Sequence, residues 1–122
     1  IRELQLAKGA IRAGTMILQK ILGIKDEDID ELLLAGAFGN YIRKESAMQM
    51  GLLPQVSLDK VRSVGNAARV GARLCLISQT KLEEASRLAK AMGYVELSGR
   101  PDFQEAFMDA MLFPRITREF AR

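Results

Sequence analysis

The chain has 122 residues, of which 48% are apolar and 27% charged, and it carries a formal net charge of +3. This composition is ordinary for a single globular domain. The sequence has no dense block of lysine and arginine, and no aromatic residues set among basic ones, so we expect no nucleic-acid partner. No apolar run approaches the ~20 residues of a membrane helix, so we expect no membrane partner either.

The sequence contains no histidine and a single cysteine, Cys75. Because histidine is the commonest general base and zinc ligand, most hydrolase and zinc-enzyme functions are excluded. One cysteine can form neither an internal disulfide bond nor a four-cysteine cluster, and a free thiol fits a cytoplasmic protein. The acidic residues between Asp26 and Asp30 lack the glycine and distal glutamate of a calcium loop, so we expect a solvated charge run. No catalytic or metal-binding residue is therefore predicted.

The first predicted element is an amphipathic helix over residues 1–22, because apolar and small residues recur there every three or four positions. The stripe expected to be buried consists of Leu4, Ala7, Ile11, Gly14, Leu18 and Ile21. Lys8 and Arg12 fall on the opposite side and are expected to be exposed. Gly9 and Gly14 each weaken a helix by about 1 kcal/mol relative to alanine. They indicate either close contact with another backbone or surface positions that tolerate glycine.

The elements that follow alternate between strands and helices. Strands are predicted at residues 31–35, 61–64 and 94–97, and helices at 43–50, 67–78, 80–92 and from 102 onward. The resulting order, α-β-α-β-α-α-β-α, favours right-handed crossovers and a parallel sheet. The predicted fold class is therefore α/β, with a short, mostly parallel sheet that carries helices on both faces. Three strands are few for such a sheet, and the missing ones are expected before residue 1.

Local patterns refine the later helices. Thr80-Lys-Leu-Glu83 has the form of a capping box, which predicts that a helix begins at Thr80. Asp102 is the expected cap of the last helix. Small residues share one face of the helix at 67–78, which predicts that this helix lies close against the sheet. They are Ala68, Gly71, Ala72 and Cys75.

Glycine follows each of the first two predicted strands, in Gly36-Ala-Phe-Gly39-Asn40 and in Gly65-Asn66. If the strands are parallel, both turns lie at the same edge of the sheet, where α/β proteins place ligands. Glycine permits positive φ and close backbone approach, and N–H groups at a helix start attract phosphate. Neither turn matches a phosphate-loop or dinucleotide-binding fingerprint. On spacing alone, a purely structural role in tight turns is slightly favoured over a nucleotide site. Lys8 and Arg12 also allow two interpretations. They can reach a ribose or phosphate of a ligand, or they can be solvated surface residues, as most such residues are.

Several segments together resemble one protein family. They are Ile1–Gly14, Leu34-Ala-Gly-Ala-Phe-Gly-Asn-Tyr-Ile42, Glu45-Ser-Ala47, Gly51-Leu-Leu-Pro54, Val64-Gly-Asn-Ala-Ala68, Phe103-Gln-Glu105 and Phe113-Pro114. Their order is unbroken and they span nearly the whole chain. They resemble the C-terminal region of the ATP-dependent reductive activators of corrinoid proteins, within the actin/sugar-kinase ATPase superfamily.

The resemblance implies a fold, an activity and a partner. The fold is part of an actin-like (ribonuclease-H-like) ATPase lobe. The activity is ATP-dependent reduction of a Co(II) corrinoid to Co(I) for a corrinoid protein of a methyltransferase system. The implied cofactors are ATP with Mg²⁺, for which this chain supplies a partial site, and an iron–sulfur cluster in an N-terminal ferredoxin-like domain. The residues implied to line the nucleotide are Gly36, Ala37, Phe38, Gly39 and Asn40, with Lys8 near the ribose.

The chain begins inside a predicted helix and without an initiator methionine, which predicts a C-terminal piece of a longer multidomain protein. Residues 1–122 are expected to form one domain that ends in a basic tail at 115–122, and to be inactive alone. Two other hypotheses remain. One is the ATPase activator of a 2-hydroxyacyl-CoA dehydratase, against which the single Cys75 argues, since that class bridges a dimer with a cysteine-bound cluster. The other is a docking or dimerisation module without its own ligand, and a homodimer is one possible partner.

Overall fold

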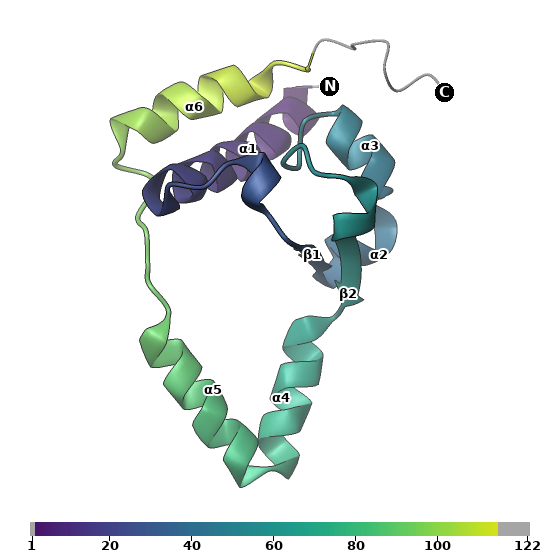
Figure 1. Cartoon of the computed structure of the whole chain (residues 1–122), viewed down its shortest axis with the longest axis vertical. Coiled ribbons are helices and arrows are strands. Elements are labelled where there is room, and N and C mark those ends of the chain that lie inside the picture. The colour runs from purple at the N-terminus through teal and green to yellow at the C-terminus, as the bar shows by residue number, and fades with distance from the viewer. Residues whose placement is uncertain (1, 115–122) are drawn as a thin grey trace.

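The computed structural model describes residues 2–114, apart from the side chains of residues 38–40. The predicted basic tail lies outside these residues. Figure 1 shows the elements in space. The helices are α1 (Arg2–Leu22), α2 (Gly36–Tyr41), α3 (Lys44–Gln49), α4 (Ala67–Ile77), α5 (Gln79–Ala91) and α6 (Pro101–Met111), and the strands are β1 (Leu32–Ala35) and β2 (Val61–Gly65). Short 3₁₀ turns at Asp26–Asp28 and Leu58–Lys60 precede the strands. None of the helices among the described residues is long and apolar enough to cross a membrane.

Strands β1 and β2 form a parallel two-stranded sheet, as predicted. Leu32 pairs with Val61 and Ala35 with Gly65, with an irregularity between Leu34 and Ala35. The predicted strand at 94–97 is wrong, because this segment has no ladder partner within the described part of the chain. Its polar groups bond locally instead. The Glu96 carboxylate accepts the Tyr94 hydroxyl at 2.6 Å and the Ser98 backbone N–H at 3.0 Å.

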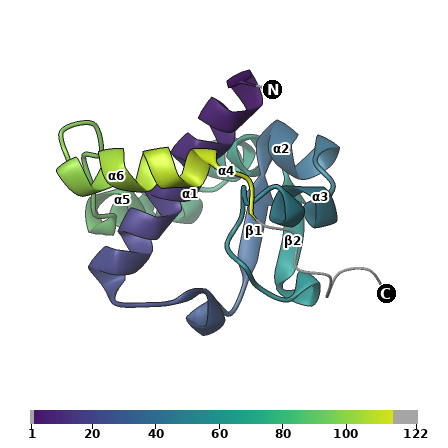
Figure 2. The same ribbon diagram turned by 90° about the horizontal axis from the view of Figure 1, so that it is seen from above.

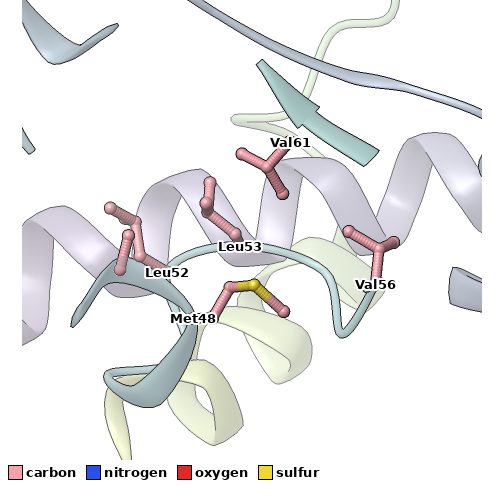
Figure 3. Packing of buried hydrophobic residues seen from close by; sticks show 6 residues of the cluster. Met48, Leu52, Leu53, Val56 and Val61 are labelled. Atoms are coloured by element: carbon pink, nitrogen blue, oxygen red, sulfur yellow. The ribbon is translucent and has the colours of Figure 1, made fainter. Parts of the chain in front are cut away.

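The apolar core covers one face of this sheet. It consists of Ala47, Met48, Leu52, Leu53, Val56 and Val61, with Leu32 and Leu34 partly buried against it. Figure 3 shows the labelled members gathered beside β2. Leu33 points to the other face, where it is 53% exposed. Helices were expected on both faces of the sheet, and the apolar core of the described residues lies on one of them.

Helix α1 packs on α6, which crosses it in Figure 2. A Cβ atom at Gly9 would lie 3.0 Å from Met111 Cγ, 3.3 Å from Phe107 Cε2 and 3.4 Å from the Met111 backbone nitrogen. Of the two interpretations of Gly9, close contact with another backbone is therefore confirmed. The predicted buried stripe is wrong except at Gly14. The buried residues of α1 are Lys8, Gly9, Ala13, Gly14, Ile17 and Gln19, whereas Leu4, Ile11, Leu18 and Ile21 are exposed. Small residues let α6 approach closely, and apolar periodicity alone does not reveal which of two overlapping stripes it will cover.

Helices α4 and α5 form a hairpin that extends away from the rest of the protein (Figure 1). Neither helix contains a buried residue, so the prediction that α4 packs against the sheet is wrong for this structure. The predicted helix start at Thr80 is also wrong. Ser78 has extended backbone angles that separate the two helices, and its hydroxyl accepts the Lys81 N–H at 3.3 Å. Ser78 is thus the N-cap of α5.

The last helix begins at Pro101 rather than after an Asp102 cap. Arg100 occupies the cap position, and proline at the first helical position needs no N–H partner. The Asp102 carboxylate accepts hydrogen bonds from the guanidinium of Arg100 at 3.0 Å and from the ammonium of Lys20 at 3.1 Å. Asp102 therefore connects the start of α6 to the end of α1.

We expect Gly9→Ala to be less stable than the matched variant Gly71→Ala. Each substitution lies in a helix and gains up to about 1 kcal/mol of helix propensity. A methyl group at Gly71 meets no atom within 4 Å and keeps this gain. At Gly9 it presses on Met111 and Phe107, which should cost about 1–3 kcal/mol. Thermal unfolding followed by circular dichroism compares the two variants, and equal stability would contradict the close contact between α1 and α6.

Candidate functional site

The two glycine turns lie together at the carboxyl edge of the sheet, as predicted. Ala35, the last residue of β1, pairs with Gly65, the last residue of β2. Gly36 has φ +71° and Gly65 has φ +62°, values that residues with a side chain rarely adopt. A Cβ atom at either glycine would meet nothing within 4 Å. Backbone conformation thus requires glycine at both positions, and the described residues leave open space beside each of them.

The first turn is tighter than predicted. Helix α2 begins at Gly36 itself, so β1 runs directly into a helix of six residues, Gly36–Tyr41. This places the predicted nucleotide-binding residues Gly36, Ala37, Phe38, Gly39 and Asn40 in one helical segment at the end of β1. At the second turn, the Asn66 side chain accepts the Arg69 N–H at 3.0 Å and caps α4. The structure therefore gives Asn66 a local role in starting a helix.

Lys8 is buried, so the prediction of an exposed side chain is wrong. It is 1% exposed, and its ammonium donates hydrogen bonds to the carbonyl oxygens of Ala110 and Leu112, each at 2.6 Å. It also lies 5.0 Å from the centre of the Phe113 ring. Carbonyl groups at the end of a helix lack partners within the helix and attract a cation. Burial lowers the pKa of Lys8 below its ordinary value. Its contact with a ribose stays a prediction.

Asp26 is a polar centre that the sequence did not reveal. Its carboxylate accepts hydrogen bonds from the Arg12 guanidinium at 3.1 Å, the Gln19 amide at 2.9 Å and the Gln55 backbone N–H at 2.6 Å. The expected solvated charge run is thus wrong for Asp26. Burial by itself would raise the pKa of this carboxyl group, but the bonds from Gln19 and Gln55 and the charge of Arg12 outweigh it and lower the pKa. Asp26 therefore joins α1 to the loop that follows α3.

A cleft of ≈ 340 Å³ lies between α1, the end of α6 and the loop after α3. Its lining includes Lys8, Arg12, Gln55 and Phe113. None of the described residues of the glycine turns lines it. Among residues 2–114, no group of histidine, cysteine, aspartate or glutamate side chains is arranged to hold a metal ion. The glycine edge and the polar contacts of Lys8 and Asp26 are therefore separate parts of the structure.

Comparison with known proteins identifies the family. The family model described as "C-terminal domain of RACo the ASKHA domain" matches residues 1–122. The chain belongs to this family. The resemblance drawn from the sequence motifs is thereby confirmed.

Two relatives and one solved structure agree with the assignment to the RACo C-terminal family. "Corrinoid activation enzyme RamQ" from Eubacterium limosum is 40% identical over 113 residues, which cover 93% of this chain and 19% of that protein. The Co(II) methylated amine-specific corrinoid protein reductase of Methanosarcina barkeri is 33% identical over 90 residues, covering 74% of this chain and 16% of that protein. The solved "Reductive activator for corrinoid,iron-sulfur protein" superposes with a TM-score of 0.85 at 35% identity, covering 93% of this chain and 18% of that one.

The structural match confirms the predicted actin-like fold class, since the family is an ASKHA domain. Within residues 2–114, the observed element order differs from the predicted one because the third strand is absent and helix α2 is added. The chain spans about a fifth of the length of the proteins it matches. The shared region of the RACo C-terminal family contains both glycine turns.

We expect Asp26→Asn to destabilise this RACo-family fold by about 1–3 kcal/mol at pH 7, because hydrogen bonds to a charged group are lost. The folded-state pKa of Asp26 is lowered. The carboxylate therefore contributes stability above its unfolded pKa, near 4, and this contribution is lost as the pH falls through the lower folded pKa. Urea unfolding across pH 2–7 should show the gap between variant and wild type shrinking below about pH 4.

Asp30→Asn is the matched control for this series, because Asp30 belongs to the same acidic run and is exposed. Its stability should follow that of the wild type at every pH. A gap for Asp26→Asn that stayed constant with pH would contradict the charge-based role of Asp26.

Proposed function

We propose that this chain is the nucleotide-binding half of an ATP-dependent activator that reduces Co(II) corrinoid to Co(I). The observation that carries the proposal is the glycine turn at Gly36, which lies at the carboxyl edge of a parallel sheet in a chain of the RACo C-terminal family. Relatives named as a corrinoid activation enzyme and a corrinoid protein reductase support the activity. The partner would be the corrinoid protein of a methyltransferase system, in the cytoplasm.

The proposed nucleotide contacts come from Gly36, Ala37, Phe38, Gly39 and Asn40. Gly36 fits this role because its backbone conformation keeps a side chain out and the space beside it is open. A nucleotide can therefore approach the main chain closely. Lys8 would have to give up two hydrogen bonds of 2.6 Å to reach a ribose, so its direct contact is the weakest part of the proposed site.

The proposed mechanism divides the work between this chain and the rest of the protein. ATP supplies the free energy for an uphill electron transfer, and this chain binds and orients the adenosine end. The Mg²⁺ that accompanies ATP is proposed to be held by the phosphates and by groups outside the glycine turn. A single cysteine, Cys75, cannot bind an iron–sulfur cluster, so the proposed cluster belongs to another domain. The isolated chain is expected to be inactive.

A docking or dimerisation role has one supporting observation. Apolar residues on the uncovered side of α1 are exposed, namely Leu4, Ile11, Leu18 and Ile21. Exposed apolar stripes of this kind are typical of protein contacts. Capture of the corrinoid protein, or formation of a homodimer, by the isolated chain would favour this role. A nucleotide half-site alone predicts neither. The dehydratase-activator hypothesis receives no support from the relatives' names.

We expect Gly39→Val to weaken ATP binding at least about tenfold, which corresponds to ~1.4 kcal/mol. A branched side chain in the glycine turn would hold the nucleotide away from the backbone. Calorimetric titration of the complete gene product with ATP measures this change. Gly99→Val is the control, because Gly99 lies in a distant exposed turn where a Cβ atom meets nothing within 4 Å. An unchanged affinity of Gly39→Val for ATP would contradict the proposal that this turn binds adenosine.

A further inference from the structure

We propose that Lys8 is a positioning residue for the glycine turn. Its ammonium holds the end of α6 and the segment Phe113-Pro114 against the turn at Gly51, and this turn fixes the helix and core residues that support Gly36. The inference rests on the proposed function where it concerns ATP. It assigns Lys8 an indirect role in place of a ribose contact.

The first step is the attachment of Lys8 to α6. Two of its three N–H groups bond to the carbonyl oxygens of Ala110 and Leu112, and its charge faces the Phe113 ring. These three partners lie in the last turn of α6 and just after it. Lys8 is only 1% exposed, and the bonds of its ammonium hold the chain that follows α6.

The second step is the packing contact between Pro114 and Gly51. A Cβ atom at Gly51 would lie 2.7 Å from Pro114 Cγ and 3.7 Å from Lys8 Nζ, so only glycine leaves room for this contact. Gly51 also has φ +75°, which favours glycine independently. Lys8, Pro114 and Gly51 therefore form one contact between the C-terminal segment and the turn after α3. We call this contact the Lys8 clamp.

The third step connects Gly51 to the core. The N–H of Leu52 bonds to the Ala47 carbonyl at 2.9 Å, and the N–H of Gly51 bonds to the Met48 carbonyl at 2.9 Å. This pair of bonds is the Schellman arrangement that ends a helix, with Gly51 as its left-handed residue. Ala47, Met48 and Leu52 are all buried in the core. Backbone hydrogen bonds thus join the Gly51 turn to the end of α3 and to residues of the core.

The last step reaches the glycine turn. Only Ile42 and Arg43 separate α2 from α3, and Ile42 packs on the same core cluster as Leu32 and Leu34. Helix α2 contacts both strands. Loss of the Lys8 clamp should therefore loosen α3 and the support of Gly36, although the hydrogen bonds described for Lys8 go to Ala110 and Leu112 and not to the turn.

The test uses three variants of the complete gene product. Lys8→Met removes the charge of the clamp while keeping an unbranched side chain. Gly51→Ala pushes Pro114 away. Gly23→Ala is the matched control, because Gly23 has φ +67° but a Cβ atom there meets nothing within 4 Å. Amide hydrogen exchange of residues 36–41 and 47–52, together with ATP affinity by calorimetry, is measured for each variant.

We expect Lys8→Met and Gly51→Ala to raise exchange in both segments and to weaken ATP binding about three- to thirtyfold. Gly23→Ala should leave both quantities as in the wild type. A ribose contact predicts instead that Lys8→Met weakens binding while Gly51→Ala does not, and this result would overturn the proposal. Unchanged exchange at 36–41 in Lys8→Met would overturn it too. If the wild type bound no ATP, the proposed function would fail, and the exchange data alone would still decide the positioning role.

Discussion

The close packing of α1 on α6 is the interaction on which the arrangement of the described chain most depends. Gly9 lets Phe107 and Met111 approach the α1 backbone, as the short distances from its Cβ position indicate. Two lysines of α1 then fix the two ends of α6. Lys20 pairs with Asp102 in the first turn of α6, while Lys8 bonds to the carbonyl groups of the last turn. The Lys8 ammonium lies at the C-terminal end of α6, where the helix dipole favours a positive charge. At the N-terminal end, the charge of Lys20 is balanced by its ion pair with Asp102. These two lysine contacts fix the direction in which the chain leaves α6.

Asp26 makes the second connection, between α1 and the core under the sheet. Its carboxylate bonds to two side chains of α1 and to the backbone of Gln55, which lies between the buried residues Leu53 and Val56. Lys60 adds a bond of 2.6 Å to the Ile29 carbonyl, next to the start of β1. Helix α1 thus reaches the sheet through polar contacts rather than a shared apolar core. Among the described residues, the α4–α5 hairpin has no equivalent polar connection, and it contributes no buried residue.

The sequence predicted the elements better than their contacts. Local patterns predicted the helix at 2–22, the parallel pairing of the first two strands and the common edge of Gly36 and Gly65. They could do so because the spacing of apolar residues and the positions of glycines depend directly on backbone conformation. The buried Lys8 did not follow, since its partners are backbone carbonyls about 100 positions away that no side-chain pattern marks. The strand expected at 94–97 failed for a similar reason, because a strand needs a partner that the segment itself does not specify.

At the candidate site, too, the sequence predicted the backbone conformation better than the contacts. The positive φ of Gly36 and Gly65 explains both glycines without any ligand, since a side chain would be strained there whatever the surrounding space. Spacing alone therefore favoured a structural role, and the geometry fulfils that role. The described residues leave the space beside both glycines open, so the structure is compatible with a ligand there, but Gly23, Gly71 and Gly99 are equally open and the open space alone does not mark a site. The backbone conformation of Gly36 lets β1 run straight into α2, and it keeps side chains off the edge of the sheet where we propose that a nucleotide binds.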